Sequence, residues 1–394
     1  MLDKLHIMFN RWFQPHKRSF LLVGPRRSGK TTWLRRKYPD YTYRTLDDFD
    51  DLGHAKADPK GFVRSLGSQA IIDEVQRFPE LLVAVKQALD AGQVHILMTG
   101  SSQMKLLAHG TETLAGRIDV FHFPTLCWGE SLGSATHRVF QDQVSRQDLQ
   151  EGQRALDEAL EFGGFPEVVA AASPDDKNDV LHNYKNTYFT RDLASLSGIE
   201  NLDGLAAVLL QHAQATGSLL EVSSFAREAG LSFETTKKYL NVLRMSDLTF
   251  DLKGFELGPA KRYIKAKKFY FADVGVITAL GSQISQGARF ELFVISELEK
   301  RRKLGGFTCE FFCYSRSVSG AEVDVIIESP KELVAIEIKS SAQVRAGDIE
   351  NLVRFARETR TKKHIRPFCI YGGLEYREIR GVQLIPVAVL HRGF

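Results

Sequence analysis

The chain has 394 residues, of which 43% are hydrophobic and 10% aromatic, so it is long enough for two to four globular domains. Its formal net charge of only +4 excludes overall basicity as evidence for a nucleic-acid partner, so such evidence must come from local patches. The apolar runs fall short of the ~18 residues of a membrane span and the charged start lacks a signal-peptide core. We therefore expect a cytoplasmic protein without a membrane partner.

A phosphate-binding loop is the first motif along the chain. An apolar strand is expected at Phe20–Val23, and it leads into GPRRSGKTT and then a helix, which is the context that such a loop requires. Gly29 lets the backbone N–H groups point at phosphates, Lys30 reaches the β and γ phosphates, and Thr31 ligates Mg²⁺. We predict that ATP and Mg²⁺ bind at Gly24, Pro25, Arg26, Arg27, Ser28, Gly29, Lys30, Thr31 and Thr32.

A second strand, expected at residues 70–74, ends in two acids. Asp73 can hold Mg²⁺ through water and Glu74 can polarise the attacking water, so the pair favours ATP hydrolysis over phosphoryl transfer to a small acceptor. A third strand, expected at residues 94–98, ends in hydroxyl side chains. Among them Ser101 either senses the γ phosphate or only caps the strand.

The order of GPRRSGKTT, AIIDE, LMTGSS and LAGRIDVFHFPTLCWGE resembles the prokaryotic AAA-type P-loop ATPases of the AAA+ superfamily that carry a C-terminal winged helix and a restriction-endonuclease-like domain of unknown function. The resemblance implies an α/β fold with a P-loop NTPase core. It divides the chain into an ATPase core (1–135), a helical lid (136–215), a winged helix-turn-helix (216–285) and an α/β restriction-endonuclease-like domain (286–394).

The same resemblance assigns roles to single residues. Arg117 matches the arginine finger, which one subunit supplies to its neighbour, so self-association is expected; a surface or ion-paired arginine is the alternative. Arg27 departs from the commonest family form, which has Gln there. Glu167 stands in the lid where many relatives place a sensing arginine.

The middle of the chain predicts a helix-turn-helix. Residues 137–153 are polar and predict a linker or an exposed helix, and from Leu219 the pattern has a glycine turn at Gly230 and an N-cap at Ser232. The second helix would offer DNA the side chains Thr235, Thr236, Lys237 and Lys238. A basic run follows at Lys261, Arg262, Lys265, Lys267 and Lys268. A protein-binding module and a solvated charged face are the alternatives to DNA contact.

The last motif is an apolar hairpin, AEVDVIIESPKELVAIEIKSS, that contains charges. Burying unpaired carboxylates costs several kcal/mol each, so a partner is needed. Mg²⁺ bound by Asp324 and Glu337 would supply it, with Lys339 stabilising a pentacovalent phosphate. The arrangement resembles restriction-endonuclease-like nucleases, which makes Glu291 the matching helix acid and a further metal ligand. The alternative is a non-cleaving copy of that fold held together by ion pairs.

Together these patterns predict an ATP-hydrolysing protein that acts on DNA, with cleavage at Asp324, Glu337 and Lys339 gated by ATP. The alternative is an ATP-driven switch whose C-terminal half only docks DNA or a protein partner.

Overall fold

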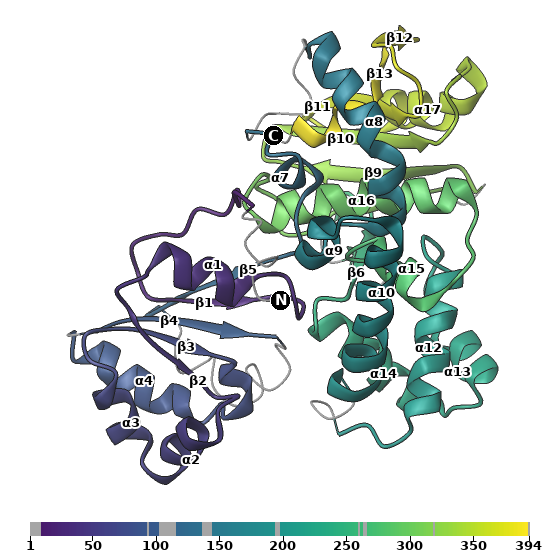
Figure 1. Ribbon diagram of the computed structural model, residues 1–394. Coiled ribbons are helices and arrows are strands. Elements are labelled where there is room, and N and C mark those ends of the chain that lie inside the picture. Colours follow the sequence, from purple (N-terminus) through teal and green to yellow (C-terminus); the bar gives the residue numbers. More distant parts are fainter. Residues whose placement is uncertain are drawn as a thin grey trace.

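The computed structural model describes residues 9–92, 94–101, 116–135, 144–193, 198–258, 261–262, 266–317 and 320–392. A layered N-terminal unit lies beside a larger body that contains the middle and the C-terminal end of the chain (Figure 1). No helix among the described residues is long and apolar enough to cross a membrane.

The N-terminal unit contains a five-stranded parallel sheet in the order β2-β3-β4-β1-β5. Its strands are β1 (Phe20–Val23), β2 (Thr42–Thr45), β3 (Gln69–Asp73), β4 (His95–Gly100) and β5 (Asp119–His122). The three strands expected from the sequence are therefore confirmed. The described helices of this unit are α1 (Lys30–Lys37), α2 (Phe49–Ala57), α3 (Pro59–Ser65), η1 (Val75–Arg77) and α4 (Leu81–Asp90).

Strand β1 shows how the centre of the sheet is buried on both faces. Leu21 and Val23 belong to the hydrophobic cluster that includes residues of α3 and α4, whereas Phe20 and Leu22 belong to the cluster that includes Leu34 of α1. A parallel strand covered by helices on both sides takes a continuous apolar run, and FLLV is such a run.

The middle of the chain is helical. The helices that the structure describes there are α7 (Trp128–Ser131), α8 (Arg146–Phe162), α9 (Pro166–Ala170), α10 (Pro174–Tyr184), the π-helix η2 (Lys185–Asp192), α12 (Leu202–Gln214), α13 (Val222–Ala229), α14 (Phe233–Met245) and α15 (Gly275–Leu280). Helix α8 begins inside the segment expected as a linker or an exposed helix, because Ser145 and Asp148 form a capping box there.

The second sheet has eight strands in the order β12-β13-β11-β10-β9-β8-β6-β7. They are β6 (Thr249–Gly254), β7 (Lys268–Phe271), β8 (Cys313–Arg316), β9 (Glu322–Glu328), β10 (Glu332–Lys339), β11 (His364–Tyr371), β12 (Arg377–Ile379) and β13 (Val382–Pro386). The accompanying helices are α16 (Gln286–Lys303), η4 (Ala346–Ile349), α17 (Glu350–Glu358) and η5 (Val387–Arg392).

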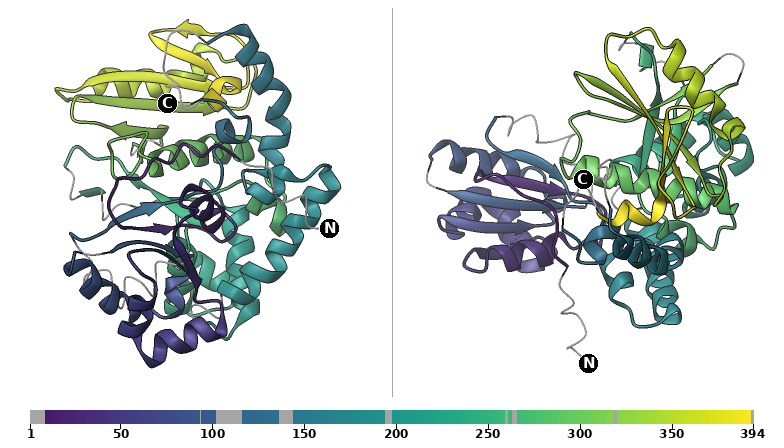
Figure 2. Two further views of the ribbon diagram at one scale, coloured as in Figure 1. Left: turned by 60° about the vertical axis from the view of Figure 1, so that its left-hand side comes forward. Right: turned by 90° about the horizontal axis from the view of Figure 1, so that it is seen from above.

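Strands β6 and β7 lie within the segment expected as a winged helix-turn-helix (216–285), but they continue the C-terminal sheet, because β6 pairs with β8 in parallel. A single hydrophobic cluster accordingly includes residues from α8 through to η5. The two ends of this body also meet, since α8 packs against η5 (Figure 2).

The charged hairpin expected from the sequence is present as β9 and β10, which pair antiparallel. Their last paired residues are Ile336 and Val325. Continued by one position, this register brings Glu337 opposite Asp324 at the end of the ladder.

Candidate functional site

The phosphate-binding loop joins β1 to α1. Strand β1 lies between β4 and β5, where the connections diverge to opposite sides, and α/β sheets bind ligands beyond the carboxyl ends of strands at such a point. Gly29 caps α1 with φ 89°, a conformation that favours glycine. The helical ladder starts with the N–H of Trp33 donating to Gly29 at 2.9 Å, so the N–H groups of Lys30, Thr31 and Thr32 have no intrahelical acceptor. They form a positive helix end suited to phosphate.

The centre of the loop is occupied by Lys30. Its buried Nζ donates to the carbonyls of Gly24 at 2.8 Å and Pro25 at 2.9 Å, and burial lowers the pKa of this lysine. The hydroxyl of Ser28 is buried and has no hydrogen-bond partner among the residues that the structure describes. A lysine held by two loop carbonyls and an unused buried hydroxyl both fit a phosphate group as ligand.

The predicted magnesium side of the site is assembled around Asp73 at the end of β3. Its carboxylate accepts hydrogen bonds from Thr31 Oγ1 at 2.9 Å, from Tyr43 Oη at 2.9 Å and from the Thr99 hydroxyl. Burial raises the pKa of Asp73 despite these hydrogen bonds, so a nearby cation would favour the ionised form. Thr31 and Asp73 are thus in contact, and their binding of Mg²⁺ stays a prediction. The contact of Tyr43 was not anticipated from the sequence.

Glu74 follows in a left-handed backbone conformation, with φ 57°. Its carboxylate accepts hydrogen bonds from Ser101 Oγ at 3.1 Å and from the Gln76 side chain, which also donates to Ser101 at 2.9 Å. Ser101, a candidate γ-phosphate sensor in the sequence, therefore lies where it orients Glu74. Gln76 is a second orienting residue that sequence reasoning missed.

The two departures from the family pattern contact each other. Arg27, at φ 60°, forms an ion pair with Glu167 of α9 at 3.2 Å, and its guanidinium lies near the Tyr184 ring. The Tyr184 hydroxyl donates to the carbonyl of Arg26 at 3.0 Å. The Arg27–Glu167 pair is exposed and adds only about 0–1 kcal/mol to stability. The pair links α9 to the phosphate loop, so its main effect is on the position of α9 relative to that loop.

Arg11 supports the loop from behind and was also missed. Its side chain is 4% exposed, forms an ion pair at 3.0 Å with the fully buried Glu130, and lies over the Phe123 ring. It donates to the carbonyls of Ser28 at 3.0 Å and Pro124 at 2.8 Å. No local motif marks this arginine, because its partners come from distant parts of the chain.

Arg117 lies just before β5 and forms an exposed ion pair with Asp90 at the end of α4. The structure describes one chain, so the supply of Arg117 to a neighbouring subunit stays a prediction.

The C-terminal carboxylates converge at the end of the β9–β10 ladder. Asp324 Oδ2 accepts a hydrogen bond from the N–H of Ile338 at 2.8 Å, and Lys339 Nζ donates to Glu337 Oε1 at 2.7 Å. The other oxygen of Glu337 is buried, and no described residue is its hydrogen-bond partner. Such an orphaned acceptor beside a second carboxylate fits a cation.

Further charges surround this pair. Lys268 of β7 forms ion pairs with Glu322 and, at 3.8 Å, with Glu291 of α16. The Tyr270 hydroxyl also donates to Glu291 at 2.8 Å. Lys268 had been expected to face DNA in a basic run, so its burial among carboxylates corrects that expectation.

The electrostatics favour added positive charge. Burial, and then the carboxylates of Glu337 and Glu291, raise the pKa of Asp324 well above its usual range. Burial likewise raises the pKa of Glu337, although Lys339 opposes this. A divalent cation would relieve this repulsion.

Three carboxylates do not form one ligand set in this cluster. In the part of the chain that the structure describes, the group whose three ligand atoms all lie within 4.8 Å of one another is a different one, formed by Asp148, Glu151 and His391. The role of Glu291 as a third metal ligand therefore stays a prediction.

The expected helix-turn-helix is present as α13 and α14, with Gly230 left-handed at the turn and Ser232 accepting from the N–H of Thr235 at 3.1 Å. Thr236 is fully buried and donates to the carbonyl of Ser232, so its expected contact with DNA is wrong. The reason is helical spacing, which puts Thr236 on the same face as Tyr239. Lys237 and Lys238 are exposed.

The basic run after β6 does not form one open surface. Arg262 is buried and paired with Glu328, and Lys267 lies 3.7 Å from Asp251. Lys265 lies outside the described residues.

Comparison with known proteins bears on the N-terminal unit. Residues 16–132 match the family described as an AAA domain. The N-terminal unit is therefore similar to AAA domains. Residues 153–287 and 286–390 match two families described as domains of unknown function, DUF8612 and DUF4143. The winged helix and the restriction-endonuclease-like domain stay predictions.

Individual relatives extend over most of the chain. An uncharacterized protein of Mycobacterium tuberculosis is 26% identical over 336 residues, which are 82% of this chain and 70% of that protein. An uncharacterized protein of Methanocaldococcus jannaschii is 24% identical over 332 residues, 80% of this chain and 74% of that protein. Among solved structures, a Walker-type ATPase of Pyrococcus abyssi is 17% identical with a TM-score of 0.34, covering 66% of this chain and 90% of that one.

Proposed function

We propose that the protein binds and hydrolyses ATP and that its C-terminal cluster is a metal-dependent DNA nuclease site gated by the nucleotide. The contact of Thr31 with Asp73, beside a phosphate loop centred on Lys30, carries the first part. The opposed carboxylates of Asp324 and Glu337, with an orphaned oxygen and an adjacent Lys339, support the second.

In the ATP reaction, the N–H groups at the start of α1 bind phosphate oxygens and Lys30 turns from the loop carbonyls to the β and γ phosphates. Thr31 and Asp73 would hold Mg²⁺, which would supply positive charge for the phosphates. Glu74 accepts the proton of the attacking water as that water bonds to the γ phosphorus, while the bond from this phosphorus to the β–γ bridging oxygen breaks and ADP leaves. Ser101 and Gln76 fix the direction of the Glu74 carboxylate.

At the C-terminal cluster, Asp324 and Glu337 would hold a divalent metal ion, which supplies Lewis acidity for a phosphodiester. Lys339 then donates to the charged phosphate oxygens. The exposed Lys237 and Lys238 of α14 supply charge for contacts with the DNA backbone.

Helix α16 offers the connection between the two sites. It contains Glu291 near its start, while near its end Glu297 accepts from the N–H of Trp128 at 2.8 Å and Lys300 donates to the Leu126 carbonyl at 3.0 Å. Residues 126 and 128 follow β5, the neighbour of the phosphate-loop strand. A shift of this segment on ATP hydrolysis would move α16 as a rigid element and hence Glu291.

A second candidate is a non-cleaving switch whose C-terminal half docks DNA or a protein. The buried Lys268 favours it, because its ammonium pairs with Glu291 and Glu322 and supplies positive charge without a metal.

The ATPase proposal is tested by phosphate release from ATP with wild type and Glu74→Gln. The variant should bind ATP like wild type but turn it over at least about 100-fold more slowly, because the general base is lost. Equal turnover would rule out the role of Glu74, and a chain that binds no ATP would rule out the site.

The nuclease proposal is tested with linear, circular and single-stranded DNA, Mg²⁺ or Mn²⁺, with and without ATP. Wild type should cleave only with ATP, Glu337→Gln and Asp324→Asn should not cleave, and all three should hydrolyse ATP. Glu332→Gln, a change on the same strand outside the cluster, is the matched control and should cleave. Intact DNA under every condition, with ATP hydrolysis retained, would favour the switch.

A further inference from the structure

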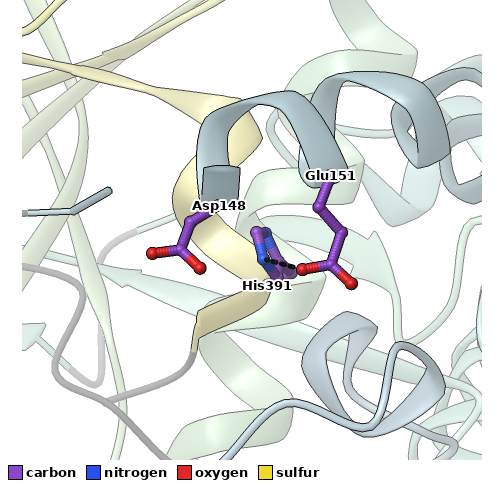
Figure 3. A group of neighbouring side chains, drawn as sticks. All are labelled: Asp148, Glu151 and His391. Atoms are coloured by element: carbon purple, nitrogen blue, oxygen red, sulfur yellow. Dashed lines mark ion pairs between the residues drawn. The ribbon is translucent and has the colours of Figure 1, made fainter. Parts of the chain in front are cut away.

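A group of ligand-type side chains lies outside both sites, where the start of α8 meets η5. Asp148 and Glu151 come from α8 and His391 from η5 near the C-terminal end, and Figure 3 shows the imidazole between the two carboxylates. One ligand atom from each lies within 4.8 Å of the other two.

The imidazole of His391 is held as a metal-binding histidine is held. Its side chain is fully buried, it lies edge-on to the Trp128 ring, and its Nδ1 is 2.8 Å from the carbonyl of Ala388. A carbonyl only accepts, so Nδ1 carries the proton and the lone pair is left on Nε2. Within the described part of the chain, Nε2 has no hydrogen-bond partner, and it lies 3.6 Å from Glu151 Oε2. A backbone carbonyl on the far nitrogen is the usual support of a histidine ligand.

The backbone is shaped to bring the two elements together. Gly152, in the middle of α8, faces η5 so closely that a Cβ would collide with the carbonyl of Ala388 and lie 2.9 Å from His391 Nδ1. Glycine inside a helix costs about 0.5–1 kcal/mol relative to alanine. At Gly152 this loss of helix stability is accompanied by a closer approach of α8 to His391, which a side chain would prevent.

We propose that His391, Glu151 and Asp148 bind one divalent transition-metal ion of the Zn²⁺ type, which fastens η5 to α8. One imidazole and two carboxylates suit such borderline cations, with water completing the shell. Ligand atoms around Zn²⁺ lie about 3.4 Å apart in a tetrahedron. The half-exposed Glu151 can close the remaining distance by changing rotamer.

A competing cation is already present. Arg392 Nη1 lies 3.0 Å from Asp148 Oδ1, while Asp148 Oδ2 accepts from Ser145. Metal binding therefore requires Arg392 to turn away or to share the carboxylate. Replacing this arginine should tighten metal binding, which an ion pair without a metal site would not do.

The test uses the full chain, freed of metal with a chelator and titrated with Zn²⁺ against a chromophoric competitor. Wild type should bind one ion that is weakened at least tenfold in Glu151→Gln and His391→Gln and tightened in Arg392→Gln. Asp157→Asn, at an exposed acid of the same helix, is the matched control and should bind like wild type. Glu337→Gln removes a carboxylate of the C-terminal cluster and should leave the affinity of the His391 site for Zn²⁺ unchanged, which distinguishes this ion from any ion bound at that cluster.

A second measurement covers the case in which His391→Gln does not fold. Zn²⁺ should raise the melting temperature of wild type and of Asp157→Asn, but not of Glu151→Gln, whose altered side chain is half-exposed and tolerates replacement. Equal Zn²⁺ affinity in wild type and Glu151→Gln, or no binding to wild type, would overturn the proposal.

Discussion

Replacing Arg11 by alanine tests how the chain supports its phosphate loop. The side chain forms a buried ion pair with Glu130 and donates to the carbonyl of Ser28 inside the loop. We expect the variant to lose stability in the N-terminal unit and to bind ATP less tightly, because one removed side chain serves both contacts.

The magnitude follows from the burial of the pair. Removing one partner of a buried ion pair costs about 3–5 kcal/mol. Glu130 keeps hydrogen bonds from the N–H groups of Trp12 and Cys127, so we expect the lower end, about 3 kcal/mol. Loss of the Ser28 contact is worth about 1 kcal/mol in the loop, or about a fivefold weaker affinity for ATP.

Urea unfolding followed by tryptophan fluorescence measures the first effect, since Trp12, Trp33 and Trp128 all lie in or next to this domain. With a slope of about 2 kcal/mol per M, the midpoint should fall by about 1.5 M. Arg18→Ala removes an exposed arginine that donates to the carbonyl of Gly116, and should change little. A shift for Arg11→Ala no larger than that control would refute the reasoning.

Three other outcomes are expected. Gly152→Ala should lower the free energy of unfolding by about 2 kcal/mol or more because its Cβ has no room, whereas Gly53→Ala, in open space on α2, should raise it by about 0.5–1 kcal/mol; urea titration compares them. Burial alone would raise the pKa of Asp247, but Lys303 and His122 lower it below its usual range. The contribution of Asp247 to the free energy of unfolding is therefore complete above about pH 4, the ordinary carboxyl range, and is lost as the pH falls below it. In Asp247→Asn, the free energy of unfolding should depend less on pH in that acidic range, which urea titration at several pH values measures. Glu167→Ala should change stability by less than about 1 kcal/mol because its ion pair is exposed, so a larger loss in thermal unfolding would contradict that assignment.

Short-range patterns were sufficient for several parts of this protein. The run FLLV followed by GPRRSGKTT predicted β1, the loop and α1, because an apolar strand, a left-handed glycine and a helix start are all properties of neighbouring residues. The acids that end β3 and the hairpin of β9 and β10 were predicted for the same reason.

Other parts depended on contacts between distant residues. Helical spacing already indicated that Thr236 is buried, so that error was avoidable. The roles of Arg11 and Lys268 could not be predicted from the sequence, because a charged residue is expected on the surface unless its buried partners are known.

The sequence by itself determined where a phosphate loop, its acids and a charged hairpin lie, since backbone geometry and hydrophobic periodicity act over a few residues. Only the tertiary structure decided that β6 joins the C-terminal sheet, that Arg27 contacts Glu167, and that His391 lies against α8. Strand pairs, ion pairs and ligand sets join residues that are far apart in the chain, and their spacing in the sequence does not indicate which of them lie close together in the fold.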